Sequence, residues 1–196
     1  MSKTGRKTLE RPNLAQIEAE ISRVKYKSGF SRAVRSTIYV LAVVAAVAVL
    51  VATLWMPVLQ ITGMSMSPTM EDGQIVLCIK SSEFDTGEPV AFYYNNKILV
   101  KRIIASAGSW VDIDEQGNVY VDGHLLEEPY LREKAFGECN IELPYQVPDG
   151  KVFVMGDDRA VSLDSRTTAV GCVSSEQLLG QVRFRIWPFA AFGPIN

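Results

Sequence analysis

The chain of 196 residues is poor in the side chains that most often carry catalysis and bind metals. It has one histidine, His124, and three cysteines, Cys78, Cys139 and Cys172, with no Cys-x-x-Cys pair. Zinc sites usually need such closely spaced ligands, so the sequence predicts no metal and no cofactor. His124 follows Asp122-Gly123, a turn signal, where a solvated side chain is expected. A Ser-His-Asp triad is therefore disfavoured, while one disulfide is possible that the sequence does not select.

Basic charge is scarce beyond the first 35 residues. These carry nine Lys and Arg and three acidic residues, and the remainder carries eleven basic and nineteen acidic ones. Nucleic acid is bound by clustered positive charge. We therefore expect no nucleic-acid partner.

Charge of either sign is missing from Ser36 to Met70. The most apolar part of this stretch, Ile38–Met56, is about 19 residues long and has Thr53 as its one clearly polar side chain. A membrane-spanning helix needs about 20 apolar residues. We therefore expect a transmembrane anchor over residues 36–58.

Basic residues flank this anchor on its N-terminal side. Arg32 and Arg35 lie just before it, and the next basic residue after it is Lys80. Positively charged flanks stay in the cytoplasm. We therefore expect a single-pass protein of the cell membrane, with a cytoplasmic segment over residues 1–35 and an extracytoplasmic domain over residues 59–196.

A cleaved signal peptide is the competing interpretation of the apolar stretch, because Ala46-Val47-Ala48 resembles a cleavage motif. The apolar regions of signal peptides are shorter, at about 7–15 residues, and lie close to the N-terminus. This one begins after residue 35, which favours a retained anchor.

The segment before the anchor has a helical pattern of its own. Asn13 is a typical capping residue, and apolar side chains recur at helical spacing after it, at Leu14, Ile17, Ile21 and Val24. The pattern predicts a short helix that either lies on the membrane surface or binds a partner.

The remainder shows no strong helical period and predicts an all-β catalytic domain of antiparallel sheets. Its turn signals are Asn95-Asn96 and Asp122-Gly123, and Ser175–Leu179 is expected to form one helical turn. Residues 127–148 are rich in Pro, Glu and Gly and are expected to form an extended loop. Runs rich in β-branched and aromatic residues predict strands at 74–79, 90–94, 97–104, 110–113, 118–121, 124–126, 151–155 and 181–186.

One irregular segment, Gly63–Met70, presents two serines soon after the apolar stretch. Its glycine and proline exclude a central strand or a mid-helix position. Such a loop is either a linker between the membrane helix and the domain or a site of catalysis, which loops on rigid scaffolds often carry.

Two later stretches favour catalysis. They are Val100-Lys101-Arg102 and the segment Met155–Arg166, which reads Met-Gly-Asp-Asp-Arg-Ala-Val-Ser-Leu-Asp-Ser-Arg. Together with Ser65–Met70 they resemble, in order, the signature motifs of the type I signal peptidases. These are membrane-anchored serine proteases with a Ser-Lys dyad and a fold of antiparallel sheets. The motifs are Ser-Met-x-Pro-Thr-Leu, Lys-Arg and Met-Gly-Asp-Asn-Arg-x-x-Ser-x-Asp-Ser-Arg. The resemblance covers most of the chain after residue 58.

The resemblance implies that Ser65 is the nucleophile and Lys101 its general base. A lysine accepts a proton only when it is neutral, and burial among apolar groups lowers its pKa. Lys101 lies in an apolar strand, where it shares a face with Leu99 and Ile103. The alternative is an ordinary lysine on an edge strand.

Further residues are assigned by the same resemblance. Ser162 matches the serine that orients the lysine amine, and its hydroxyl also favours the neutral amine by accepting a hydrogen bond. Asp164 and Arg166 match a charged pair that holds this segment, and Gly156 and Asp157 shape the turn after the preceding strand. The oxyanion donor is the Ser65 N–H.

The chain departs from the family pattern at several positions. Gly63 replaces a serine that supplies a second oxyanion donor in some members. Asp158 replaces the usual Asn and adds negative charge near the site. The turn at 105–109 keeps only Gly108 of four family positions.

The partners implied are preproteins with signal peptides, the lipid bilayer and the protein export machinery. Small substrate side chains would fill pockets beside Ser65 with Met or Ile/Val walls, and the substrate would lie as an extended strand. The apolar segment Ile186–Phe192 either seats the site at the bilayer or belongs to the core. Two rivals are a non-catalytic assembly factor for surface fibres and a self-cleaving Ser-Lys regulator.

Overall fold

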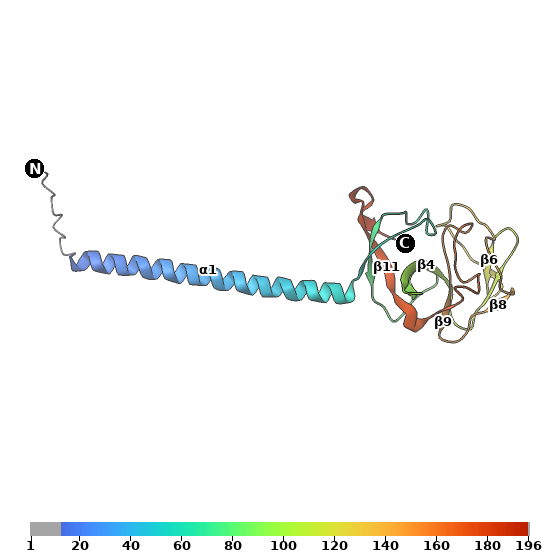
Figure 1. Cartoon of the computed structure of the whole chain (residues 1–196), viewed down its shortest axis with the longest axis horizontal. Helices are drawn as coiled ribbons and strands as arrows, with labels where there is room; N and C mark the ends of the chain where they lie inside the picture. Colours follow the sequence, from blue (N-terminus) through green and yellow to red (C-terminus); the bar gives the residue numbers. More distant parts are fainter. Residues whose placement is uncertain (1–12, 196) are drawn as a thin grey trace, which may run out of the picture. The chain divides into compact units, whose positions relative to one another are not determined.

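A computed structural model describes residues 13–195 of the chain, with residues 24–29 and 31 described by their backbone alone (Figure 1). The first twelve residues of the expected cytoplasmic segment lie outside this range. The chain divides into two compact units, Met1–Val51 and Ala52–Asn196, and each is considered by itself.

From Leu14 onward the first unit belongs to one long helix, α1, over Leu14–Trp55. Its start is capped, since the Asn13 N–H donates to the Gln16 side-chain oxygen at 3.1 Å. Its portion Arg32–Trp55, 24 residues with a mean hydropathy of 2.6, is long and apolar enough to cross a membrane. At 1.5 Å per residue this portion is about 36 Å long. The short helix expected near Asn13 is thus the beginning of a continuous one.

The second unit contains a large antiparallel sheet with the strand order β1-β2-β11-β3-β4-β9-β10 and with β12 paired to β11. Figure 1 labels β11, β4 and β9 within it. The register places Val90 opposite Lys101 and Arg102 opposite Met155. The strands are β1 (Val58–Gln60), β2 (Ile75–Ile79), β3 (Pro89–Tyr94), β4 (Lys97–Ala105), β9 (Lys151–Met155), β10 (Val173–Ser174), β11 (Leu178–Trp187) and β12 (Gly193–Pro194).

A smaller antiparallel sheet has the order β7-β6-β5-β8. Asp122 and Gly123 have φ of 53° and 79°, as the predicted type I′ hairpin turn requires. A short 3₁₀ helix, η1 (Ser175–Gln177), confirms the expected helical turn. The strands of this sheet are β5 (Trp110–Ile113), β6 (Val119–Val121), β7 (His124–Leu125) and β8 (Tyr145–Gln146).

The core of the large sheet reaches under the serine loop. Met66 and Met70 of that loop are buried in one cluster with Val76 of β2 and Val182 of β11. These methionines therefore hold the loop against the sheet, while Ser65, directly before Met66, stays half-exposed. The predicted all-β domain of antiparallel sheets with one N-terminal apolar helix is confirmed, and all three cysteines are free.

The C-terminal aromatic residues do not belong to the core. Trp187, Phe189 and Phe192 are 47%, 74% and 59% exposed, and Phe189 begins a second 3₁₀ helix, η2 (Phe189–Ala191). The Trp187 and Phe189 rings pack edge-to-face with centroids 5.0 Å apart. Of the two interpretations of this segment, burial in the core is wrong for these three side chains, because each of them is largely exposed.

Candidate active site

The serine loop leaves the backbone N–H of Ser65 available. Within residues 13–195 this N–H donates to no other group, whereas the Ser65 carbonyl accepts the Asp158 N–H at 3.1 Å. Gly63 adopts φ +89°, and its N–H donates to the Asp72 carboxylate at 2.7 Å. The donor at Gly63 is therefore occupied, and the one at Ser65 is free to stabilise an oxyanion.

Lys101 is buried in β4, with 3% of its surface exposed, and its amine donates to the Ser162 hydroxyl at 2.9 Å. Burial lowers the pKa of the Lys101 amine from 10.5 to about 8; Asp164 and Asp157 oppose this shift and Arg166 adds to it. About a tenth of the amines are therefore neutral at pH 7, instead of well under 1%.

Ser65 and Ser162 both pack closely against Gly156. A methyl group at Gly156 would collide with the Ser162 side chain and with the Ser65 carbonyl oxygen, so both lie against its Cα. In the part of the chain that the structure describes, no hydrogen bond joins the Ser65 hydroxyl to Lys101. Such catalytic bonds are often long without substrate and tighten when it binds.

Asp164 and Arg166 form a fully buried bidentate ion pair, with Nε–Oδ1 and Nη2–Oδ2 distances of 2.9 Å. The same carboxylate accepts the Gly156 N–H at 3.0 Å, and Arg166 also donates to the Ser162 carbonyl at 3.4 Å. The pair therefore ties Gly156 to the turn that carries Ser162.

A second buried pair links the three sequence motifs to one another. Arg102, next to Lys101, donates to both Asp157 carboxylate oxygens at 2.9 and 2.8 Å. The Thr69 hydroxyl of the serine loop donates to the same carboxylate. Asp157 therefore does more than shape a turn, because its side chain binds β4 and the serine loop together.

Sequence reasoning missed Glu128, Tyr130 and Arg159. Tyr130 lies under the Arg102 guanidinium, 3.8 Å from ring centroid to Cζ, and donates to Glu128 at 3.0 Å. Glu128 forms a buried ion pair with Arg159, which also donates to the Gly156 carbonyl at 3.0 Å. The expected loop at 127–148 has only the short strand β8, but its start is part of the wall around the site.

Glu128→Ala is expected to destabilise the fold by about 3–5 kcal/mol, because Arg159 would remain buried without its counter-charge. The free energy of unfolding in urea measures this effect. Glu127→Ala is the matched control: this neighbouring carboxylate is exposed, and its loss should change stability by less than about 0.5 kcal/mol. Equal stability of the two variants would contradict the buried pair's structural role.

A groove of about 340 Å³ lies beside Ser65, between the chain following β1 and the first half of β4. Ile61, Met66 and Val100 line it, which are the wall types that the sequence suggested. β1 is an edge strand, and β9 pairs with β4 only from Arg102 onward. Both borders of the groove therefore present backbone groups to which an extended peptide can bind.

His124 is exposed, and its ring lies 3.1 Å from the Asp122 carbonyl at the hairpin turn. Residues 13–195 contain no group of three or more His, Cys, Asp or Glu side chains placed to hold a metal ion.

Comparison with known proteins shows the family of this chain. A sequence model of the family described as "Signal peptidase, peptidase S26" matches residues 34–187. Signal peptidase IB of Staphylococcus aureus (strain Mu50 / ATCC 700699) is 36% identical over 152 residues, which cover 67% of this chain and 78% of that protein. Signal peptidase I of Bacillus caldolyticus is 35% identical over 149 residues, covering 67% and 80%. A crystal structure of a signal peptidase I from Enterococcus faecalis V583 has a TM-score of 0.44 and 25% identity, and covers 51% of this chain and 97% of that one. The family match over more than half of its length shows that this chain belongs to the signal peptidase family, peptidase S26, a family of serine peptidases.

Proposed function

We propose that this chain is a membrane-anchored endopeptidase that removes signal peptides from exported preproteins through an acyl-enzyme on Ser65, with Lys101 as general base. The observation that carries the proposal is the buried Lys101 amine, which is bonded to Ser162 and separated from the serine loop by a glycine without a side chain. A nucleophile, a base and a residue that orients the base are the parts that acyl transfer needs.

The proposed reaction begins with neutral Lys101, which takes the Ser65 hydroxyl proton as the oxygen attacks the scissile carbonyl. The oxyanion is held by the Ser65 N–H. Protonated Lys101 then gives its proton to the leaving amine. The neutral amine next activates a water molecule, which releases the acyl group from Ser65. Throughout, Ser162 keeps the amine directed, while the Asp164–Arg166 pair holds Ser162 in place.

The groove beside Ser65 receives the substrate as an extended strand between β1 and the first half of β4. Its apolar walls fit small side chains close to the cut. Residues 36–58, most of which belong to the apolar helical portion Arg32–Trp55, serve as the anchor, with residues 1–35 in the cytoplasm and residues 59–196 as the extracytoplasmic domain. The exposed Trp187, Phe189 and Phe192 suit contact with the bilayer surface.

Cleavage of a purified preprotein by the full chain in detergent tests the proposal, with Ser65→Ala as the control. Mass spectrometry should find one new N-terminus, at the bond that follows the signal peptide, with wild type alone. If wild type leaves every precursor intact, the peptidase function is wrong and a non-catalytic assembly role gains support. If Ser65→Ala cleaves as wild type does, the nucleophile is wrong.

Ser162→Ala is expected to lower kcat about fivefold with little change in KM, because one hydrogen bond that orients the amine contributes about 1 kcal/mol. Steady-state kinetics on a precursor peptide would separate the two constants. The unfolding midpoint is the control: the variant has to remain folded at the assay temperature, although the mostly protonated Lys101 amine loses its buried acceptor. An unchanged kcat would exclude Ser162 as a positioning residue.

A further inference from the structure

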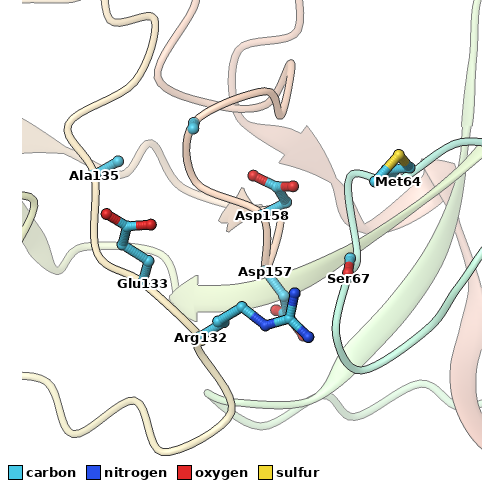
Figure 2. A pocket seen from close by; sticks show the side chains of 8 residues that line it. Met64, Ser67, Arg132, Glu133, Ala135, Asp157 and Asp158 are labelled. Carbon is cyan, nitrogen blue, oxygen red and sulfur yellow. The ribbon is translucent and has the colours of Figure 1, made fainter.

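A second cavity, of about 230 Å³, lies on another side of the serine loop (Figure 2). Figure 2 shows Met64 and Ser67 on one wall and Arg132, Glu133 and Ala135 on the facing wall. Asp157 and Asp158, from the turn after β9, lie between the two walls in this view. The cavity therefore brings together the serine loop, the turn at 157–160 and the segment at 132–135.

This cavity and the substrate groove meet at Ser65. Ser65 and Met66 line the groove, while their neighbours Met64 and Ser67 line the cavity. The Asp158 N–H donates to the Ser65 carbonyl at 3.1 Å, which fixes the cavity directly against the nucleophile's backbone. A peptide that fills the groove up to its scissile bond and continues past Ser65 therefore enters the cavity with the residues that follow the cut.

The cavity is lined by more unpaired negative charge than unpaired positive charge. Asp157 is neutralised by its ion pair with Arg102. Within residues 13–195, the carboxylates of Asp158 and Glu133 and the guanidinium of Arg132 form no ion pair or hydrogen bond. Two free carboxylates thus outweigh one free guanidinium. Asp158 is also half-buried on a turn fixed by two ion pairs, whereas Arg132 is exposed on an irregular segment.

We propose that this cavity binds the first residues of the mature protein, and that Asp158 together with Glu133 makes the enzyme prefer a basic side chain there over an acidic one. The inference rests on the proposed peptidase function and adds a specificity on the far side of the cut. Opposite charges across a partly exposed contact attract weakly, and like charges repel by a similar amount. Their sum corresponds to about a tenfold preference for Lys over Glu at low salt.

The experiment uses one precursor in which Lys, Ala or Glu is placed in turn at each of the first three positions after the cut. With wild type, kcat/KM should be about tenfold higher for Lys than for Glu at one of these positions, and the ratio should fall at high salt. Asp158→Asn keeps the size of the side chain and the backbone bond to Ser65, and should reduce the ratio to about threefold or less. Glu133→Gln should reduce it less, because Glu133 is exposed.

Glu115→Gln is the control for general charge effects, since this exposed carboxylate does not line the cavity and its loss should leave the ratio as in wild type. If the ratio is the same in wild type and Asp158→Asn, or if Glu is preferred, the inference is overturned while cleavage of the Ala precursor still supports the peptidase function. If wild type cleaves none of the precursors, the function itself fails and the inference fails with it.

Discussion

Replacing Lys101 by methionine is expected to lower kcat/KM for precursor cleavage by about 10⁴- to 10⁶-fold, and Ser65→Ala should cost as much. Serine is a poor nucleophile until its proton is removed, and His124, the single histidine of the chain, is exposed at a hairpin turn. Because the two residues act as a unit, the double variant should be little worse than either single one. Single-turnover cleavage of a labelled precursor measures all three.

The thermal stability of Lys101→Met serves as the folding control, and this substitution is expected to leave stability unchanged or to raise it. At pH 7 the buried amine is mostly protonated, although burial favours its neutral form, and a pKa of about 8 instead of 10.5 corresponds to roughly 3 kcal/mol of lost stability. Between these two values the unfolded chain binds the extra proton, so this group's contribution to stability rises with pH there. Lys101→Met should therefore be inactive and yet unfold at a temperature no lower than wild type at pH 7. An exposed lysine, Lys151, is the matched control, and Lys151→Met should keep its activity.

The pH profile of wild type provides an independent measurement of the same amine. As the pH rises through about 8, Lys101 loses its proton and becomes able to act as a base, so kcat/KM should rise and then level off. A rise centred near 10.5 would mean that the base is a solvated lysine. A plateau that already begins at pH 6 would point to a different group.

The sequence predicted those strands of the domain that are long enough to show a pattern of exposed and buried side chains. Runs of β-branched residues identified β5 and β9 to the residue, because side chains alternate between exposed and buried in β5 and are buried after Lys151 in β9. β1, β8, β10 and β12 have only two or three residues each, too few for any periodicity, and exist because a longer neighbour offers them hydrogen bonds. The burial of Lys101 was predictable because Lys101 shares a strand face with Leu99 and Ile103.

The support around the site had no such local signal. Tyr130 and Glu128 lie in a stretch that is rich in loop-forming residues, and their partners Arg102 and Arg159 are 28 and 31 positions away. Asp157 was assigned to a turn because it follows a strand and a glycine, whereas burial beside Arg102 gives its carboxylate a second task. Contacts of this kind arise when the chain is packed, and a single sequence does not encode them in its spacing.

The contact at Gly156 leads to the second large effect. Gly156→Ala is expected to reduce kcat/KM at least about 100-fold, because displacements near 1 Å at a catalytic group have costs of this size. The new methyl group would collide with the Ser162 side chain on one side and with the Ser65 carbonyl on the other. A side chain can rotate away, but a backbone oxygen cannot, so the serine loop and the turn at 156–162 must separate. Ser65, the proposed nucleophile, would then move away from Ser162, whose hydroxyl accepts the hydrogen bond of the Lys101 amine.

Gly193→Ala is the matched control for this substitution. Gly193 lies in β12 with open space where its Cβ would be, and its backbone does not require glycine, so the variant should keep wild-type activity. Near-ultraviolet circular dichroism of Gly156→Ala should still show a packed core, because the methionines under the serine loop keep their contacts with the sheet.

Adding Ser162→Gly to Gly156→Ala frees one side of the methyl group and leaves the collision with the Ser65 carbonyl. The double variant should therefore stay inactive. If it regained activity, the important contact would be with the Ser162 side chain; if Gly156→Ala alone stayed within threefold of wild type, close approach of the two segments would not be needed for catalysis.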